Sequence, residues 1–255
     1  MLRRSAAGLL ALGLRASLAS STPPTFRFVV INDIHSRDQR CIPWLHKIAA
    51  SIATHNPDFI LINGDVANAG LHSQLLPVKE ILGALGCPLH ATIGNHDYLT
   101  DTDHTPFDTL FPNSINYHFQ RAGWQFIALD STQNRTAAFT HIQPRTLAWL
   151  DATLPTLDPT LPTVAFTHFP LGEAILTRPL NAPDLLTRLS RLNLRATFSG
   201  HWHGYAERHF AHATITNSRC ASWWRPNMDG SPQKGYFLCQ TTPTQTLDHT
   251  FCVVT

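Results

Sequence analysis

The 255-residue chain contains five cysteines but no Cys-x-x-C pair. Thiolate zinc sites and redox-active dithiols usually show that spacing, so the sequence indicates neither kind of site. Most of the cysteines have apolar neighbours, which is typical of thiols buried in a core. Their disulfide state is left open by the sequence, including a bridge between the last two. The five positions are Cys41, Cys87, Cys220, Cys239 and Cys252.

Charge of either sign is also scarce. Charged residues make up 14% of the chain, lysine occurs only three times, and the formal net charge is +2. A protein that coats nucleic acid needs a basic face for phosphate contacts, so we expect no nucleic-acid partner. No run of 18 apolar residues occurs, and we expect no membrane-spanning segment. Against this background the 15 histidines stand out, because they can titrate or bind metal near neutral pH.

Residues 1–20 have the pattern of an export signal. The pair Arg3-Arg4 precedes a mildly apolar stretch, and small residues follow it. This pattern predicts cleavage near Ser20 and export to the periplasm by the twin-arginine route, which carries folded proteins. Arg15 interrupts the apolar stretch, so the alternative is an unstructured tail on a cytoplasmic protein. Removal of the three arginines in this segment would take the formal charge from +2 to −1.

The remaining length suits one globular domain, which we place at residues 25–255. Apolar strand-like runs alternate with amphipathic helical patterns, which is typical of parallel strands joined by crossover helices. After Gly200 the helical pattern stops, and short strand-like runs predict a closing antiparallel section. Strands are expected at 26–32, 59–63, 88–93, 124–129, 163–167, 196–199, 213–216, 236–240 and 246–254, and helices at 41–55, 73–85, 144–154 and 182–192.

Five of the predicted strands end in side chains that can bind metals. Ligands of open α/β sheets gather outside the carboxyl ends of the strands, so these side chains are expected to share one crevice. The five strand ends carry Asp33-Ile34-His35, Gly64-Asp65, Gly94-Asn95-His96-Asp97, His168 and Gly200-His201-Trp202-His203.

The residue types and spacings favour a site for two metal ions. In an extended segment residues i and i+2 point the same way, so each Asp-x-His or His-x-His pair is expected to bind one ion. Carboxylate, amide and imidazole groups suit divalent metals, and seven such residues exceed the four ligands of a tetrahedral zinc. Asp65 is predicted to bridge the ions, because it follows a glycine and has no partner ligand two residues on. The glycines at 64, 94 and 200 are expected to let the backbone turn sharply.

As an ordered set, D-x-H, G-D, G-N-H-D, H and G-H-x-H resemble the calcineurin-like metallophosphoesterase superfamily over residues 26–210. The resemblance is closest to its cyclic-nucleotide phosphodiesterase-like branch, because purple acid phosphatases carry Tyr where this chain has Asn68 and lack the histidine found here at His35. It implies an α/β fold, a four-layer α/β/β/α sandwich, with a dinuclear centre of Mn, Fe, Zn or Co. It places Asp33, His35, Asp65 and His203 on one ion, and Asp65, Asn95, His168 and His201 on the other.

The resemblance also implies that the chain hydrolyses small phosphate-containing substrates with a hydroxide that bridges the two ions. His96 matches the family's non-ligand histidine, which donates a proton to the leaving group or stabilises the phosphoryl oxygens. Asp97 is predicted either to orient His96 or to cap the following turn. Phosphodiesters, phosphomonoesters and pyrophosphates are not distinguished, and neither is the oligomeric state. The alternatives are a nuclease with the same metal core and a non-catalytic scaffold of the same fold.

The sequence says less about which residues line the opening of the site. Between Asp97 and His168 the chain is too short for a large cap domain, so we expect an open site. Arg37 and the segment 218–236 are candidates for its lining. Within that segment, the pair Trp223-Trp224 either stacks a base or packs over the closing strands.

Overall fold

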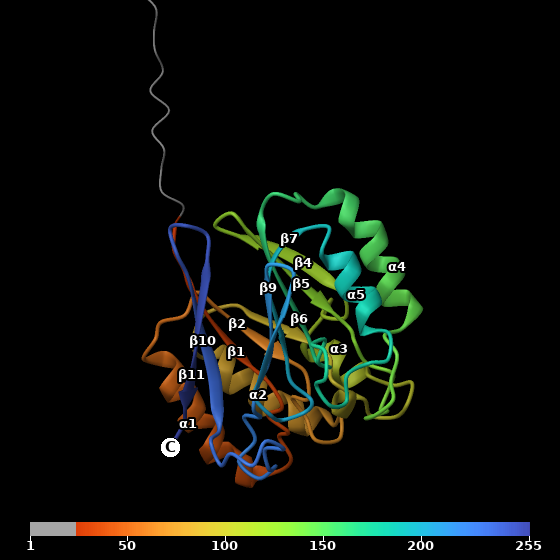
Figure 1. Cartoon of the computed structure of the whole chain (residues 1–255). Helices are drawn as coiled ribbons and strands as arrows, with labels where there is room; N and C mark the ends of the chain where they lie inside the picture. The colour runs from red at the N-terminus through yellow and green to blue at the C-terminus, as the bar shows by residue number, and fades with distance from the viewer. Residues whose placement is uncertain (1–23) are drawn as a thin grey trace, which may run out of the picture.

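Two mixed β-sheets lie face to face between helices in residues 24–255, the residues that the computed structural model describes (Figure 1). The predicted export signal, residues 1–20, lies outside these described residues. In the five-stranded sheet, with order β11-β10-β1-β2-β3, strands β1 to β3 are parallel and the other two are antiparallel to their neighbours. Its strands are β1 (Arg27–Ile31), β2 (Phe59–Asn63), β3 (Leu89–Thr92), β10 (Gly235–Thr241) and β11 (Leu247–Val253).

The six-stranded sheet has the order β4-β5-β6-β7-β9-β8. Strands β5, β6, β7 and β9 are parallel, and an antiparallel strand pairs with each end of that group. The strands are β4 (Tyr117–Arg121), β5 (Trp124–Leu129), β6 (Pro162–Thr167), β7 (Asn193–Ser199), β8 (Ala206–Phe210) and β9 (Ala213–Asn217).

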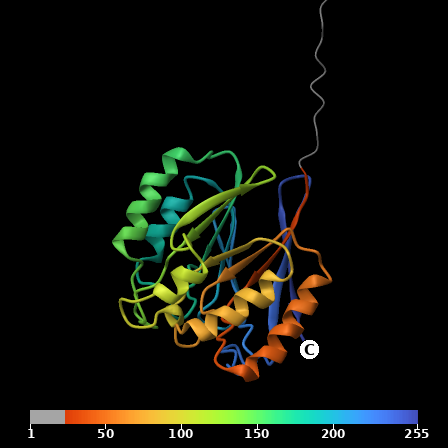
Figure 2. The ribbon, with the colours of Figure 1, turned by 180° about the vertical axis from the view of Figure 1, so that it is seen from behind.

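Helices cover the outer face of each sheet. The first sheet is covered by α1 (Ile42–Ala53) and α2 (His72–Gly83), with the short α3 (Thr105–Leu110) beside them (Figure 2). The second is covered by α4 (Pro144–Thr153) and α5 (Ala182–Leu189). The layers are therefore α/β/β/α, and the predicted fold class is confirmed. None of the helices in residues 24–255 is both long and apolar enough to cross a bilayer.

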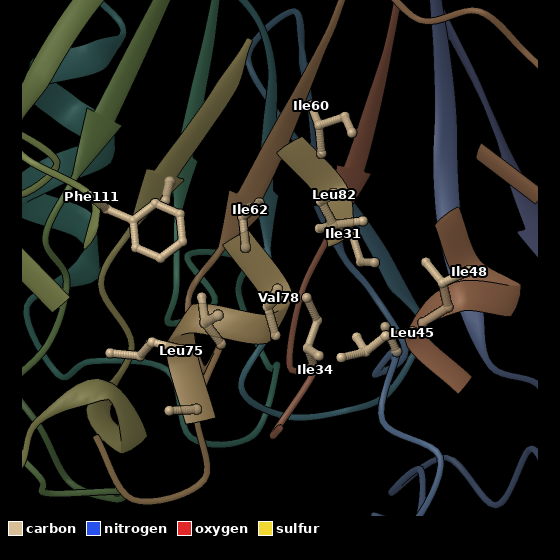
Figure 3. Close-up of a cluster of buried hydrophobic side chains, with 14 of the residues drawn as sticks. Ile31, Ile34, Leu45, Ile48, Ile60, Ile62, Leu75, Val78, Leu82 and Phe111 are labelled. Carbon is tan, nitrogen blue, oxygen red and sulfur yellow. The ribbon is translucent and has the colours of Figure 1, made fainter. Parts of the chain in front are cut away.

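Continuous apolar strands are required because each sheet is covered on both faces. In β1, Val29 and Ile31 face the helices and Phe28 and Val30 face the other sheet, so the alternation of side chains feeds two cores. Figure 3 shows the outer core, in which isoleucines of the first sheet meet leucines and a valine of α1 and α2.

The core between the sheets is built largely from aromatic rings. Phe28 stacks on Phe59 with centroids 5.0 Å apart, and Phe126 of the second sheet meets both rings edge-on at 5.4 and 5.1 Å. Such tilted aromatic contacts add to the free energy of burial and fix how the two sheets lie against each other. That fixed arrangement matters because the site uses loops from both sheets.

The strands after Gly200 do not form the single antiparallel section that the sequence predicted. Strand β9 pairs in parallel with β7, and β8 returns antiparallel to β9, so both join the second sheet. Strands β10 and β11 instead complete the first sheet. The strands β4 and β8 and the helix α3 were not predicted, because β4 and β8 are half-exposed edge strands of mixed polarity and α3 has only six residues.

The cysteines form no disulfide in residues 24–255. Cys41, Cys220 and Cys239 are buried, as predicted for core thiols, whereas Cys87 and Cys252 are half-buried.

One histidine joins the two sheets at their edge. The ring of His90 on β3 stacks on Phe119 of β4, with centroids 3.8 Å apart, and burial lowers the pKa of His90 to about 4. In the unfolded chain its pKa returns to about 6.5, so the unfolded state takes up a proton first as the pH falls. We therefore expect His90 to stabilise the fold above pH 6.5 and to lose that contribution between pH 6.5 and 4.

The replacement His90→Phe should keep the stacking and remove the protonation. In chelator-treated protein, we expect the loss of unfolding free energy between pH 7.5 and pH 5 to shrink by about 1 kcal/mol, allowing for solvent around a half-buried ring. Urea titrations at the two pH values measure it. The matched control is His118→Phe, on the exposed face of β4, which should leave the pH dependence as it is. An unchanged pH dependence in the His90 variant would contradict the assignment.

Candidate metal centre

The loops after five parallel strands meet where the carboxyl ends of the two sheets face each other. Strands β1, β2 and β3 are neighbours in the first sheet, and β6 and β7 in the second. The His201 N–H donates to the Asp33 carboxylate at 2.8 Å, which ties the second sheet to the first. All nine residues singled out in the sequence lie in these loops: Asp33, His35, Asp65, Asn95, His96, Asp97, His168, His201 and His203.

The backbone at these loops is not extended. Asp33, His35, Asp65, His201 and His203 all have φ between +48° and +65°, the left-handed region that non-glycine residues rarely occupy. The prediction that each pair is aligned by the alternation of an extended strand is therefore wrong. Tight left-handed turns bring the pairs together instead. Each such residue costs about 1–3 kcal/mol of strain, which is typical of a functional site held by the surrounding structure.

Only one of the three glycines in these loops serves the turn. Gly64 has φ +75°, as predicted. Gly94 has φ −108° and Gly200 is not in the left-handed region either, so their role is different. A Cβ at Gly94 would collide with the carboxylate of Asp65, and a Cβ at Gly200 with that of Asp33. These two glycines provide room for the buried carboxylates.

The replacement Gly94→Ala should therefore push the Asp65 carboxylate out of place. We expect it to weaken metal binding and to lower the free energy of unfolding by about 1–3 kcal/mol, as overpacking does. Metal titration and urea unfolding measure the two effects. The matched control is Gly83→Ala at the end of α2, where a Cβ meets nothing within 4 Å and adds helix propensity. Metal affinity equal to wild type in the Gly94 variant would exclude this role.

A first set of ligand atoms comes from the loops after β1 and β7. The Nε2 atom of His203 lies 3.3 Å from Asp33 Oδ1 and 3.1 Å from His35 Nε2. Asp33 Oδ1 is buried and accepts no hydrogen bond from residues 24–255. Buried polar atoms are almost always paired, so an orphan carboxylate oxygen beside two facing imidazole nitrogens fits the ligand set of a cation.

A second set comes from the loops after β2, β3, β6 and β7. His168 Nε2 lies 3.3 Å from Asp65 Oδ1 and 3.2 Å from Asn95 Oδ1. One ligand atom each from Asp65, His168 and His201 falls within 4.8 Å of the others. The His201 ring is held there by Phe169, whose ring centroid is 3.8 Å away.

Asp65 lies between the two sets. Its Oδ1 faces His168, whereas its Oδ2 is 3.5 Å from His35 Nε2. The carboxylate is fixed in this position, because Oδ1 also accepts the N–H of His96 at 2.8 Å. No other carboxylate in residues 24–255 offers its two oxygens to two such groups of histidines.

Four histidines in the site turn one ring nitrogen away from it, to a backbone carbonyl. This second contact fixes the ring and leaves the other nitrogen for the site. Sequence reasoning did not find these partners, because a carbonyl group carries no residue-specific signal. The pairs are His168 Nδ1 with Asn63 (2.9 Å), His201 Nε2 with Ala137 (2.8 Å), His203 Nδ1 with Pro226 (3.3 Å) and His96 Nδ1 with Asn68 (2.8 Å).

The charges in the site attract cations to the same two places. Burial would by itself raise the pKa of Asp33 and Asp65, but His203 and His168 hold both pKa values below the ordinary range. Burial lowers the pKa of His168 and His203, but the two carboxylates raise them in the end, to about 9 and about 11. Each ionised carboxylate therefore favours a positive charge beside it, and a bound metal ion would take the place of the imidazole proton.

The remaining imidazoles are suited to binding metal as neutral groups. Burial lowers the pKa of His35 well below its usual value and that of His201 to about 4. Neutral imidazole, carboxylate and amide oxygens are donors for divalent transition metals. The predicted ligand set thus fits two metal ions. Its donor atoms are of the right type, Asp33 Oδ1 is buried without a hydrogen-bond partner, and the two carboxylates favour positive charge.

The segment with Asn95, His96 and Asp97 is a 3-10 turn rather than a strand end. Successive side chains in such a turn are about 120° apart, so Asn95 and His96 can both face the site from different directions. The His96 ring meets His35 at 4.8 Å, and one nitrogen lies within 4.8 Å of ligand atoms of His35 and Asp65. His96 therefore lies beside the ligand atoms, as Asn95 does.

Asp97 lies behind the site. Its two carboxylate oxygens accept the N–H groups of Ala67 (2.8 Å) and Gly94 (2.9 Å), and none of its hydrogen bonds reaches His96. The predicted contact by which Asp97 would orient His96 is thus not made. Asp97 caps the 3-10 turn Asn95–Asp97, to which it belongs, and not the turn that follows. Burial, with the nearby Asp65, raises the pKa of Asp97 to about 7. Its contacts hold the loops after β2 and β3 together.

A cavity of about 250 Å³ opens over the ligand atoms. Arg225 and Met228, both within the predicted segment 218–236, line it, whereas Arg37 does not. The remaining lining residues are His35, Asp65, His96, Ala137, Thr177, His201, Trp202, His203 and Pro226.

The tryptophan pair does not offer a free stacking surface in this cavity. The guanidinium groups of Arg37 and Arg225 lie over the Trp224 ring, 4.6 and 4.7 Å from its centroid, and its Nε1 donates to the His35 carbonyl. The Trp224 ring packs against the core over the first sheet, whereas Trp223 is 41% exposed outside the cavity.

Known proteins are similar to this chain in sequence and in fold. The family model described as calcineurin-like phosphoesterase matches residues 26–205. A glycerophosphodiester phosphodiesterase, GpdQ, of Enterobacter lignolyticus is 29% identical over 69% of this chain and 69% of its own length. A probable cyclic nucleotide phosphodiesterase of Synechococcus is 26% identical over 61% of this chain, which spans 62% of that relative.

Solved structures agree on the fold. A dimetal phosphatase of Danio rerio superposes with a TM-score of 0.65 at 14% identity, over 84% of this chain and 92% of its own. A purple acid phosphatase of yellow lupin gives 0.63 at 12% identity, over 89% and 52%. The chain therefore belongs to the calcineurin-like phosphoesterase family and is a metal-dependent phosphoesterase.

Proposed function

We propose that this protein hydrolyses phosphodiesters at a centre of two divalent metal ions. The observation that carries the proposal is the position of Asp65, with one carboxylate oxygen 3.3 Å from His168 and the other 3.5 Å from His35. A carboxylate shared in this way is what a two-metal site requires. Asp33, His35 and His203 would complete one ion's ligands, and Asn95, His168 and His201 the other's.

The net charge of the loaded site supports phosphate binding. Two divalent ions exceed the charge of the two carboxylates Asp33 and Asp65, so the site would attract an anionic ester. When bound, the ions lower the pKa of water and neutralise charge on the phosphoryl oxygens. The left-handed turns hold the ligands in place before substrate arrives, so little reorganisation is needed.

The proposed reaction breaks one P–O bond and forms another. The oxygen of water bonds to phosphorus and gives up one proton to the solvent, and the electron pair of the broken bond leaves with the departing alkoxide oxygen. His96 donates the proton that this oxygen needs, from the ring nitrogen opposite the Asn68 carbonyl. The products are an alcohol and a phosphomonoester.

Phosphodiesters are favoured over monoesters by the cavity and by the relatives. Ala137, Pro226 and Met228 give the mouth an apolar lining that can accept a second ester substituent. The named activities of the two sequence relatives are phosphodiesterase activities. Since the cavity is open, a substituent on either side of the phosphorus can be accommodated.

A substrate panel tests the proposal. Protein stripped of metal and reloaded with Mn, Fe, Zn or Co is assayed on bis(4-nitrophenyl) phosphate, 4-nitrophenyl phosphate and pyrophosphate. We expect the diester to be hydrolysed with the highest kcat/KM, and chelation to abolish the activity. Faster hydrolysis of the monoester would contradict the diester preference. Cleavage of plasmid or single-stranded DNA at a comparable rate would favour the nuclease.

A further inference from the structure

Arg225 carries the unpaired positive charge at the mouth of the cavity. It lines the cavity with His96, yet no ion pair among residues 24–255 includes it. Its Nε is buried and has no hydrogen-bond partner in those residues. The nearby arginines differ, because Arg37 pairs with Asp38 at 3.1 Å and Arg219 with Asp229 at 2.8 Å.

The guanidinium of Arg225 is nonetheless held in one position. Its Nη2 donates to Asn68 Oδ1 at 2.8 Å, and its Cζ lies over the Trp224 ring, 4.7 Å from the centroid. Trp224 is itself fixed by its hydrogen bond to the His35 carbonyl. A long side chain that is fixed by neutral groups keeps its full charge for a ligand.

Asn68 places Arg225 on the side of His96. The side-chain oxygen of Asn68 accepts from Arg225, whereas its backbone oxygen accepts from His96 Nδ1 at 2.8 Å. One residue thus fixes both the predicted proton donor and the free guanidinium. In the proposed reaction the leaving group departs past His96, so it passes Arg225.

We propose that Arg225 forms an anion subsite for the leaving group, so that the preferred substrates carry a second oxyanion on the departing alcohol. The inference rests on the proposed function, because it takes its direction from the role of His96. A guanidinium can bind a carboxylate or phosphate through two parallel hydrogen bonds. Arg225 would determine which leaving groups are preferred. The reaction itself is unchanged, because the P–O bond to the leaving group breaks and the water oxygen bonds to phosphorus.

Two matched diesters test the subsite. Ethyl 4-nitrophenyl phosphate releases a nitrophenolate that has no further charged group, and ethyl 3-carboxy-4-nitrophenyl phosphate adds one carboxylate to that leaving group. Metal-loaded wild type should show the higher kcat/KM on the carboxylated ester. In Arg225→Gln we expect a loss of about 10- to 100-fold on that ester and a much smaller loss on the other. Arg225→Lys keeps the charge and should recover part of the loss.

The matched control is Arg37→Gln, which removes the other guanidinium over Trp224 and should leave the ratio of the two esters unchanged. Equal losses on both esters in Arg225→Gln would place Arg225 on the scissile phosphate and overturn the proposal. So would a wild type without preference for the carboxylated ester.

Calorimetric titration separates this proposal from the proposed function. The leaving group itself, 5-hydroxy-2-nitrobenzoate, should bind metal-loaded wild type more tightly than Arg225→Gln, whereas 4-nitrophenol should not distinguish them. If wild type hydrolysed neither ester, the proposed function would fail, and the titration would still decide whether the subsite exists. Equal binding of the benzoate to both proteins would exclude it.

Discussion

Asp65→Ala is expected to leave the folded protein without either metal ion and to lower kcat/KM on a phosphodiester at least about 10³-fold. The reason is geometric, because Asp65 turns one carboxylate oxygen to His168 and the other to His35, whereas Asp33 approaches both histidines with a single oxygen. Elemental analysis of the purified protein, after dialysis without added metal, measures the loss directly. Two tightly held ions in the variant would exclude Asp65 as the bridge.

Asn95→Ala is the comparison that makes this result specific. The Asn95 amide oxygen contacts only the second set, at 3.2 Å from His168 Nε2, so its loss should mainly empty one position. A protein with one ion from Asn95→Ala and none from Asp65→Ala would distinguish a bridging from a terminal ligand. Equal metal content in the two variants would contradict the assignment.

His96→Ala is expected to keep both metals and to lose about 10²- to 10⁴-fold in rate on alkyl phosphodiesters. The proton matters most when the departing oxygen is a strong base, so the loss on a nitrophenyl ester should be much smaller. Rates on the two kinds of ester, together with metal content, test the role. A nitrogen of His96 lies near ligand atoms of His35 and Asp65, so the metal measurement is essential.

The alternatives for His96 have different outcomes. Equal losses on alkyl and nitrophenyl esters would show that His96 stabilises the phosphoryl oxygens instead of the leaving group. Loss of an ion would show that it is a ligand. Asn68→Ala is a useful companion, because its backbone carbonyl remains to hold His96 while the contact to Arg225 is removed.

The site depends on two sheets that are far apart in the chain. His168 of the second sheet reaches the Asn63 carbonyl of the first at 2.9 Å, and Asp33 of the first accepts the His201 N–H of the second. Burial of the aromatic core between the sheets therefore stabilises the site as well as the fold. The strain in the ligand loops persists because these contacts hold them.

The sequence by itself determined most of the strands and the residues that follow five of them. Residues 59–63 are an example. A strand that is buried on both faces is a continuous apolar run in the sequence, so it can be identified without tertiary information. The residue types at the strand ends predicted a metal site, because parallel strands present those ends at one edge. Edge strands such as β8 were not predicted. They are only partly buried, so their sequence shows a weak alternation of apolar and polar residues.

Only the tertiary structure decided how those residues meet. Left-handed turns at Asp33 and His201, and space for carboxylates at Gly94, cannot be predicted from the residue types. Aspartate and histidine occur in left-handed turns more often than most residues, but only a small fraction of them do. The carbonyl partners of the histidines and the free charge of Arg225 depend on segments more than 20 residues away along the chain. Sequence patterns report local preference and burial, whereas these contacts arise where distant loops are packed against each other.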